Sequence, residues 1–210
     1  MRIIKLLMIA IIQARTSSRR FKNKVMIEIK GKPMISHVIE SIKKSKMIKK
    51  LVIATSNKKS DDLLAQYLKR NFINIYRGSL RNVAQRMYNT AKKFNANYFI
   101  RISGDSPFLD KKIIERAIKI HKKNIHKFDL ITNVFPKTYP QGQSVEIIKR
   151  SLLKKTIPLM NADEKEHVTK YFYKHPKMFK IKNFKATKKS DKKLSIDTKK
   201  DLERLKYKFR

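Results

Sequence analysis

The sequence predicts an α/β fold built on a mostly parallel central sheet. Apolar runs rich in β-branched residues alternate along the chain with amphipathic helical stretches, which is the pattern of βαβ units. The hydrophobic share of 41% is large enough to fill a core. Because 210 residues fit one domain, and because the chain shows neither an internal repeat nor a low-complexity linker, we expect a single domain over residues 1–210.

Five apolar runs have the length and composition of buried strands. They are Met8–Ile12, Leu51–Ala54, Asn74–Tyr76, Tyr98–Ile102 and Asp129–Thr132. The pattern loosens after about residue 133, where Pro136, Pro140 and Gly142 indicate loops, and a further strand is expected over Ser144–Lys149. We interpret this stretch as an excursion from the sheet, in the region beyond the strand ends where substrates bind.

Four helices are expected between the strands. The first begins at Pro33, in a first-turn position, and buries one stripe of isoleucine and valine side chains. The second is capped by Ser60, with Asp61 and Asp62 in its first turn, where the helix dipole favours carboxylates. The other two cover Leu80–Phe94 and Lys111–Lys123, with Asp110 capping the latter.

The N-terminal residues MRIIKLLMIAII superficially resemble a signal peptide. No small-x-small cleavage site follows them, and the run is too short to cross a bilayer. Met8 is an alternative start, which would make the first seven residues an extension ahead of the first strand. We therefore expect a soluble cytoplasmic protein without a membrane span.

A net charge of +37 suggests a nucleic-acid binder, but the composition argues against one. Lysine outnumbers arginine 40 to 13 and isoleucine outnumbers valine 27 to 7, as AT-rich codons favour. Evolved recognition of phosphates and bases more often enriches arginine. We expect no specific nucleic-acid partner, and the absence of cysteine excludes disulfides, cysteine-ligated zinc and a thiol nucleophile.

Chemically active side chains concentrate after the first strand, over residues 13–24. The loop after strand one of an open α/β sheet is the usual place for a nucleotide's phosphates. The chain has neither a GxGxxG nor a GxxxxGK motif, so hydroxyls and cations would have to hold the phosphates. Three of the seven positions from Arg15 to Phe21 are arginine, in a chain where arginine is scarce. This local enrichment favours a triphosphate site over a solvated basic loop.

Two aspartates are candidates for holding a divalent metal. Asp105 follows the predicted strand Tyr98–Ile102, at the edge where a bound phosphate would lie. The alternative is that residues 104–107 form an ordinary turn. Asp197 could be the second carboxylate of a metal pair, a helix N-cap, or both.

Eight segments together resemble one enzyme group. In order they are IIQARTSSRRFKNK at 11–24, GKPMISHVIE at 31–40, LVIATSN at 51–57, YRGS at 76–79 with Arg86 downstream, RISGDSPFLD at 101–110, TYPQGQSVE at 138–146, KEHVTKY at 165–171 and LSIDTKKDL at 194–202. The chain is thereby identified as similar to the cytidylyltransferases of the spore-coat polysaccharide biosynthesis protein F group, relatives of the CMP-KDO and CMP-sialic acid synthetases. Departures are Phe21-Lys22-Asn23 in place of Leu-Pro-Gly, Gln141 in place of Arg, and Ser144 in place of an acidic residue.

The resemblance implies a three-layer, Rossmann-like domain of the glycosyltransferase-A type. Such an enzyme transfers CMP from CTP to a sugar or sugar-acid hydroxyl, releases pyrophosphate, uses Mg²⁺ and acts as a homodimer. The resemblance further divides the chain into a nucleotide-binding core over about 8–132, an acceptor and dimerisation excursion over about 133–190, and a returning metal-binding strand with a terminal helix over 191–210.

Site residues carried over from the resemblance fall into three groups. Residues implied to bind the nucleotide are Ala14, Arg15, Ser18, Arg19, Lys24, Thr55, Ser56, Arg77, Ser79 and Ser103. Residues implied to contact the acceptor are Arg86, Arg101, Asn133, Glu146 and His167. The implied catalytic residues are Arg15, Lys24 and Asp105, and the implied metal ligands are Asp105 and Asp197.

Two other functions stay open at this point. A sugar-nucleotide-dependent glycosyltransferase of the same fold would usually carry a DxD metal motif, and the chain has none. A basic nucleic-acid-binding protein would show steeply salt-dependent binding, but no recognised motif supports it. We rank the cytidylyltransferase first, the glycosyltransferase second and the nucleic-acid binder third.

Overall fold

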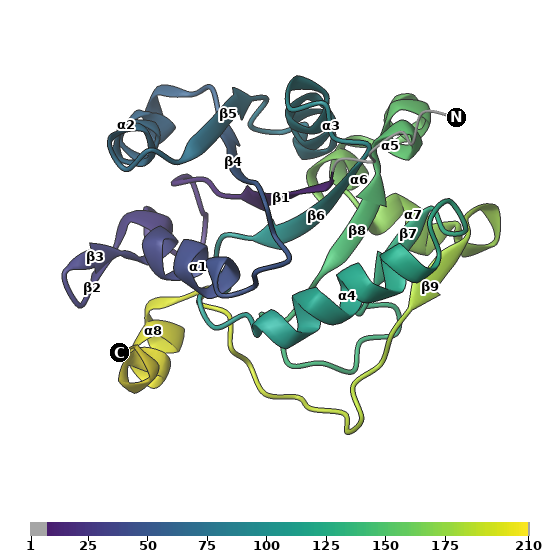
Figure 1. Cartoon of the computed structure of the whole chain (residues 1–210). Coiled ribbons are helices and arrows are strands. Elements are labelled where there is room, and N and C mark those ends of the chain that lie inside the picture. The colour runs from purple at the N-terminus through teal and green to yellow at the C-terminus, as the bar shows by residue number, and fades with distance from the viewer. Residues whose placement is uncertain (1–7, 210) are drawn as a thin grey trace.

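A computed structural model describes residues 8–209, so the expected extension over residues 1–7 lies outside the described residues. A seven-stranded sheet in the order β5-β4-β1-β6-β8-β7-β9 runs through the middle of the molecule (Figure 1). Its strands are β1 (Met8–Gln13), β4 (Leu51–Ser56), β5 (Asn74–Gly78), β6 (Tyr98–Ser103), β7 (Leu130–Thr132), β8 (Glu146–Lys149) and β9 (Ile181–Asn183). A separate hairpin pairs β2 (Glu28–Ile29) with β3 (Lys32–Pro33).

Helices cover both faces of the sheet (Figure 1). They are α1 (Met34–Lys43), α2 (Asp62–Arg70), α3 (Val83–Lys93), α4 (Lys111–Lys123), α5 (Arg150–Thr156), α6 (Ala162–Glu166), α7 (Lys170–Lys174) and α8 (Lys199–Leu205). Short 3₁₀ turns lie at η1 (Lys24–Met26), η2 (Lys59–Asp61), η3 (Ile157–Leu159), η4 (Pro176–Met178) and η5 (Lys206–Lys208). None of the helices among residues 8–209 has the length and apolar character needed to cross a membrane.

The pairing of the strands confirms the predicted α/β class. β1 pairs in parallel with β4 and β6, and β4 pairs in parallel with β5. β8 runs antiparallel to both β6 and β7, while β9 pairs in parallel with β7. The sheet is therefore mostly parallel, and the chain after residue 133 returns to the same sheet through β8 and β9.

Alternating side chains of β1 supply the two halves of the core. Ile9 and Ile11 pack in the cluster that includes side chains of α3 and α5. Ala10 and Ile12 point to the opposite face and pack with side chains of α1 and α4. Because both faces of the central strands are covered, the molecule has the expected three layers.

The predicted elements are found with shifted boundaries. All five expected strands form, and β1, β4, β5 and β6 continue one or two residues further toward the site. The helix expected over Leu80–Phe94 begins later, at Val83, because the side chain of Asn82 caps it by accepting the amide of Gln85. The Lys111–Lys123 helix is confirmed, and the carboxylate of Asp110 caps it as expected.

Two predicted helix caps are wrong. Ser60 does not cap α2, because it lies inside the 3₁₀ turn η2. Asp62 lies in the first turn of α2 as expected, whereas Asp61 precedes that turn and is fully buried. Asp197 does not cap α8 either: Thr198 does, in a reciprocal capping box with Asp201. The carboxylates of Asp61 and Asp197 therefore hydrogen-bond to groups other than helix amides.

The sequence did not predict the elements of least regular pattern. The hairpin β2–β3, the short helices α5, α6 and α7, and strand β9 were all missed. Of the returning strand and terminal helix expected over 191–210, the helix forms as α8, whereas the strand is reduced to an isolated bridge between Lys193 and Gln141.

Gly104 tests how tightly β1 and β6 approach at their carboxyl ends. A Cβ at this position would lie 2.8 Å from the carbonyl oxygen of Gln13 and 2.9 Å from the Cβ of Ala14. We predict that Gly104→Ala lowers the free energy of unfolding by about 1–3 kcal/mol, because the loop after β1 must shift. Urea denaturation measures this, with the exposed Gln66→Ala as control. An unchanged midpoint for Gly104→Ala would contradict the close approach.

Candidate active site

The carboxyl ends of β1, β4 and β6 bring three loops to one edge of the sheet (Figure 1). In the parallel register, Gln13 of β1 lies beside Ala54 of β4 and Ser103 of β6. The loops that follow these strands contain Lys24 and Asp105. A ligand bound at this edge can therefore contact residues from all three loops, as in other open α/β sheets.

Lys24 is the point where the predicted catalytic and metal-binding residues meet. Its ammonium group donates to Asp105 Oδ2 at 2.9 Å, to the Ile196 carbonyl at 3.1 Å and to Asp197 Oδ1 at 3.3 Å. The lysine is buried, and the side chain of Asp197 is only 7% exposed. These three bonds occupy all three donors of the ammonium group.

Further donors surround the carboxylate of Asp197. Arg20 donates to Oδ1 at 3.0 Å, and the Gln141 side chain donates to Oδ2 at 3.1 Å. Burial raises the pKa of Asp197, but the charges of Lys24 and Arg20 outweigh burial and hold that pKa below its usual value. The sequence did not predict that Arg20 and Gln141 contact Asp197, although Arg20 is one of the three arginines from Arg15 to Phe21.

The donor set around Lys24 fits a magnesium ion. Asp105, Asp197 and the carbonyl of Ile196 converge on one cationic atom, and hard oxygen ligands of this kind suit Mg²⁺. Within residues 8–209, no three His, Cys, Asp or Glu side chains gather as a metal site, so the protein side chains offered here are the two aspartates alone. A metal held here would rely on phosphate oxygens and water for its remaining ligands, as Mg²⁺ commonly does.

The loop of residues 14–23 folds around the carbonyl group of Thr16. This carbonyl accepts the amide of Ser18 at 2.9 Å and the amide of Asn23 at 2.8 Å. Ser18 is half-buried and Arg19 is exposed, so both remain accessible to a ligand. Arg15 is held by Glu166 at 2.8 Å, a partner that the sequence did not identify.

The residues implied to surround the nucleoside lie at the same edge, but several are engaged within the protein. Thr55 and Ser56 are buried at the end of β4, and Ser56 hydrogen-bonds to Asp61. Arg77 donates to the Ser56 carbonyl at 2.9 Å and also pairs with Asp62 at 2.6 Å. Ser79 is exposed and holds the backbone amide of Asn82, while Ser103 is half-buried at the end of β6.

Three of the implied acceptor residues share a hollow of about 570 Å³. Arg101, Glu146 and His167 line it. Arg101 pairs with Glu146, which also accepts the hydroxyl of Tyr173 at 2.5 Å. Burial, and then the charge of Glu146, raises the pKa of Tyr173, so its hydroxyl keeps its proton. Lys137, Lys170 and Lys174 complete the cationic lining.

Arg86 lies in a smaller hollow of about 110 Å³, next to the first. Gln13, Ala14, Arg15 and Glu166 line this hollow with it, and His167 borders both hollows. Arg86 is 2% exposed and makes its hydrogen bonds to the carbonyls of Ser79 and Leu80. Burial, helped by the charge of Arg15, lowers the pKa of Arg86 to about 10.

Asn133 stands apart from the other implied acceptor residues. It is fully buried and lines neither of these two hollows. Its side-chain amide donates to the Gln143 carbonyl at 2.8 Å, and its side-chain carbonyl accepts the Val145 amide at 2.9 Å. The structure thus places Asn133 as a support of the loop that precedes β8.

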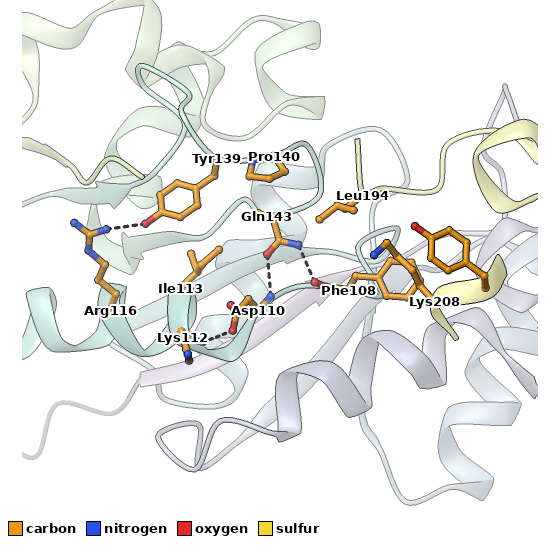
Figure 2. Close-up of a pocket in the computed structure, with 11 residues that line it drawn as sticks. Phe108, Asp110, Lys112, Ile113, Arg116, Tyr139, Pro140, Gln143, Leu194 and Lys208 are labelled. Carbon is orange, nitrogen blue, oxygen red and sulfur yellow. Dashed lines mark hydrogen bonds between the residues drawn. The ribbon is translucent and has the colours of Figure 1, made fainter. Parts of the chain in front are cut away.

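A further hollow, of about 860 Å³, is not the predicted site. It lies between α4, the loop around Pro140 and the C-terminal segment (Figure 2). Gln143 bridges its floor by accepting the Asp110 amide at 2.9 Å and donating to the Phe108 carbonyl at 2.7 Å. None of the predicted site residues lines this hollow.

Comparison with known proteins decides the family. The sequence model described as "Cytidylyltransferase" matches residues 9–207, which is nearly the whole described chain.

The chain belongs to the cytidylyltransferase family.

Relatives and a solved structure agree with this assignment. The chain is 34% identical over 199 residues to the uncharacterised protein MJ1063 of Methanocaldococcus jannaschii, covering 92% of this chain and 79% of that protein. It is 29% identical to the spore coat polysaccharide biosynthesis protein SpsF of Bacillus subtilis, over 93% and 83% of the two chains. A cytidylyltransferase structure from Leptospira borgpetersenii shares 29% identity with a TM-score of 0.90, over 95% and 84% of the two chains. The resemblance stated from the eight sequence segments is confirmed.

Removal of the lysine tests the charge arrangement of this cytidylyltransferase site. We predict that Lys24→Met lowers the free energy of unfolding at pH 7 by about 3–5 kcal/mol, because two carboxylates lose their buried cation. The lowered pKa of Asp197 means that its stabilising contribution is present above about pH 4 and is lost as pH falls through the folded-state pKa. The stability difference between the two proteins should therefore narrow below about pH 4.

Urea denaturation at pH 7 and at pH 3.5 measures this difference. The exposed Lys22→Met, in the same loop, is the matched control and should change stability little. Equal stability of Lys24→Met and wild type at pH 7 would show that the lysine does not neutralise the pair.

Proposed function

We propose that this cytidylyltransferase transfers CMP from CTP to the hydroxyl of a sugar or sugar acid and releases pyrophosphate. The observation that supports this most is the convergence of Asp105 and Asp197 on Lys24, beside the arginine-rich loop after β1. Cations for a triphosphate and carboxylates for a metal lie at one strand edge. The homodimer implied by the family resemblance stays a prediction.

The chain's own cations would supply most of the charge neutralisation. Displacement at the α-phosphorus needs an in-line approach of the acceptor oxygen, and little covalent chemistry falls to the protein. Arg15, Arg19 and Lys24 would bind the triphosphate, with Ser18 as a hydroxyl donor. Because the donors of Lys24 are all occupied, triphosphate binding has to draw the lysine from at least one of its acceptors.

Magnesium would be held by Asp105 and Asp197. When bound, it would neutralise charge on the phosphate oxygens. Arg20 and Lys193 also contact Asp197, so this carboxylate keeps cationic partners when Lys24 turns to the phosphates. Gln141 donates to the same carboxylate and orients it.

The lining of the 570 Å³ hollow favours an acidic acceptor. Its one carboxylate, Glu146, is already paired with Arg101 and hydrogen-bonded to Tyr173. Lys170 and Lys174 also line it, but they pair with Asp163 at 2.6 Å and with Glu164 at 2.9 Å. Lys137 is the lining lysine that has no ion pair within residues 8–209. A sugar acid would bring a carboxylate that can pair with Lys137. Biosynthesis of a surface polysaccharide or glycan is the process in which we place the product, in keeping with the family resemblance.

Nucleotide selectivity tests the proposal without knowledge of the acceptor. We expect CTP with Mg²⁺ to raise the melting temperature more than ATP, GTP or UTP, since a ligand at a hundredfold excess over its Kd stabilises by about 2.7 kcal/mol. Asp105→Asn should abolish the shift. Asp110→Asn is the matched control, because asparagine caps a helix as well as aspartate does.

Equal shifts with all four nucleotides that disappear in salt would contradict this function. The charge of +37 would then be attracting anions without selecting them.

Acceptor chemistry gives a second prediction. Pyrophosphate release from CTP should depend on an acidic sugar, and Lys137→Ala should raise KM for that sugar roughly fivefold, as loss of about 1 kcal/mol of partly exposed charge pairing implies. Lys177→Ala, an exposed lysine that does not line the hollow, should leave KM unchanged. Equal activity with neutral sugars would contradict an acidic acceptor.

A further inference from the structure

We propose that Asp61 is a positioning residue that fixes the nucleotide loop to the end of β4. This inference rests on the proposed function, because it concerns the loop that would bind the triphosphate of CTP. Asp61 belongs to none of the motifs that carried the family resemblance.

The two carboxylate oxygens of Asp61 hold two different strand ends. Oδ1 accepts the amide of Thr16 at 2.7 Å and its hydroxyl at 2.7 Å. Oδ2 accepts the amide of Ser56 at 3.1 Å and also its hydroxyl. Thr16 lies in the loop after β1 and Ser56 ends β4, so one side chain joins both sides of the proposed nucleotide site.

These bonds extend to residues at both ends of the loop. Thr16, held by Asp61, offers its own carbonyl to the amides of Ser18 and Asn23, and Asn23 directly precedes Lys24. The hydroxyl of Thr16 is shared with the carbonyl of Ser60 at 2.7 Å. The position of Asp61 therefore influences where Ser18 and Lys24 lie relative to a bound triphosphate.

The same carboxylate also supports the other side of the site. Ser56 presents its carbonyl to the guanidinium of Arg77, a residue implied to contact the nucleoside. The backbone amide and the hydroxyl of Ser56 both donate to Asp61, which restrains Ser56 at the end of β4. One buried side chain thus sets the spacing between the loop after β1 and the residues after β4.

Asp61 is built to accept and not to pair with a cation. It is fully buried, and within residues 8–209 no lysine, arginine or histidine forms an ion pair with it. Burial raises its pKa, but the hydrogen bonds from Ser56 and Thr16 more than offset burial, and its pKa stays below the usual value. The ionised carboxylate offers four acceptor directions, and asparagine in its place cannot accept on both sides.

An aspartate at the start of a helix commonly caps it by accepting a backbone amide of the first turn, and Asp61 does not do this. The N-cap position of α2 carries no side-chain hydrogen bond. All four bonds of Asp61 go to the two residues that flank the site. Side chains that bind a substrate need support of this kind to stay within a fraction of an ångström of their working positions.

Asp61→Asn tests the proposal with little change in volume. Its amide group would face the donors of either Thr16 or Ser56, so one of the two attachments is lost. We expect the Kd for CTP with Mg²⁺, measured by calorimetry at 15 °C, to rise at least tenfold. We also expect the backbone amides of Ser18 and Asn23 to exchange with solvent faster than in the wild type.

Two further variants separate positioning from general stability. Ile42→Val removes one methyl group from the buried face of α1, lowers stability, and should leave both the Kd and the loop exchange unchanged. Ser56→Ala removes the hydroxyl that donates to Oδ2 and that accepts the Lys58 amide at 3.3 Å, and should raise the Kd by a smaller factor than Asp61→Asn. If Asp61→Asn folds poorly, Ser56→Ala still tests whether the attachment to β4 affects CTP binding.

The outcomes distinguish this inference from the proposed function. A wild-type protein that binds no CTP would overturn the proposed function itself. A wild type that binds CTP, beside an Asp61→Asn protein whose Kd lies within twofold of it and whose Ser18 and Asn23 amides exchange at the wild-type rate, would overturn the positioning role.

Discussion

A buried lysine between two aspartates is the interaction on which the arrangement of this site depends. Lys24, Asp105 and Asp197 come from three separate parts of the chain. The opposite charges offset the free-energy cost of removing each group from water. The lysine brings the loop after β1 against the end of β6, and its bond to the Ile196 carbonyl draws the C-terminal segment to the same edge. The site therefore forms only when these charges are paired. A ligand that takes the place of an aspartate beside Lys24 must supply comparable negative charge.

The charge of +37 makes the placement of the carboxylates more informative than that of the cations. Carboxylates are few, and each of those near the site has a defined contact. Asp197 pairs with cations, Glu166 pairs with Arg15, and Asp61 accepts hydrogen bonds from uncharged donors. Lysines on the surface need no such explanation, because composition alone scatters them. In the 570 Å³ hollow Glu146 is paired with Arg101, Lys170 with Asp163 and Lys174 with Glu164, which leaves Lys137 for an acidic acceptor.

The strands and long helices were predictable because their hydrophobic period is strong, as in Met8–Gln13 and Lys111–Lys123. The position of Asp105 at the sheet edge followed from the end of the predicted strand Tyr98–Ile102, and Asp197 was a candidate second metal ligand from the sequence, whereas Lys24 came from the family resemblance. What sequence could not give were contacts that depend on loop paths. Ser60 and Asp61 have the composition of a helix start, yet the chain turns through η2 and buries the carboxylate against Thr16. Arg20 and Glu166 likewise gain their roles only from the way distant segments meet.

A crystal structure of the full chain with CTP and Mg²⁺ would test the central claim most directly. The account predicts the triphosphate against the loop of residues 14–24, the metal between Asp105 and Asp197, and Lys24 turned from at least one of these carboxylates toward the phosphates. A nucleotide found instead in the 860 Å³ hollow between α4 and the C-terminal segment, with Lys24 still bound to both aspartates, would contradict it.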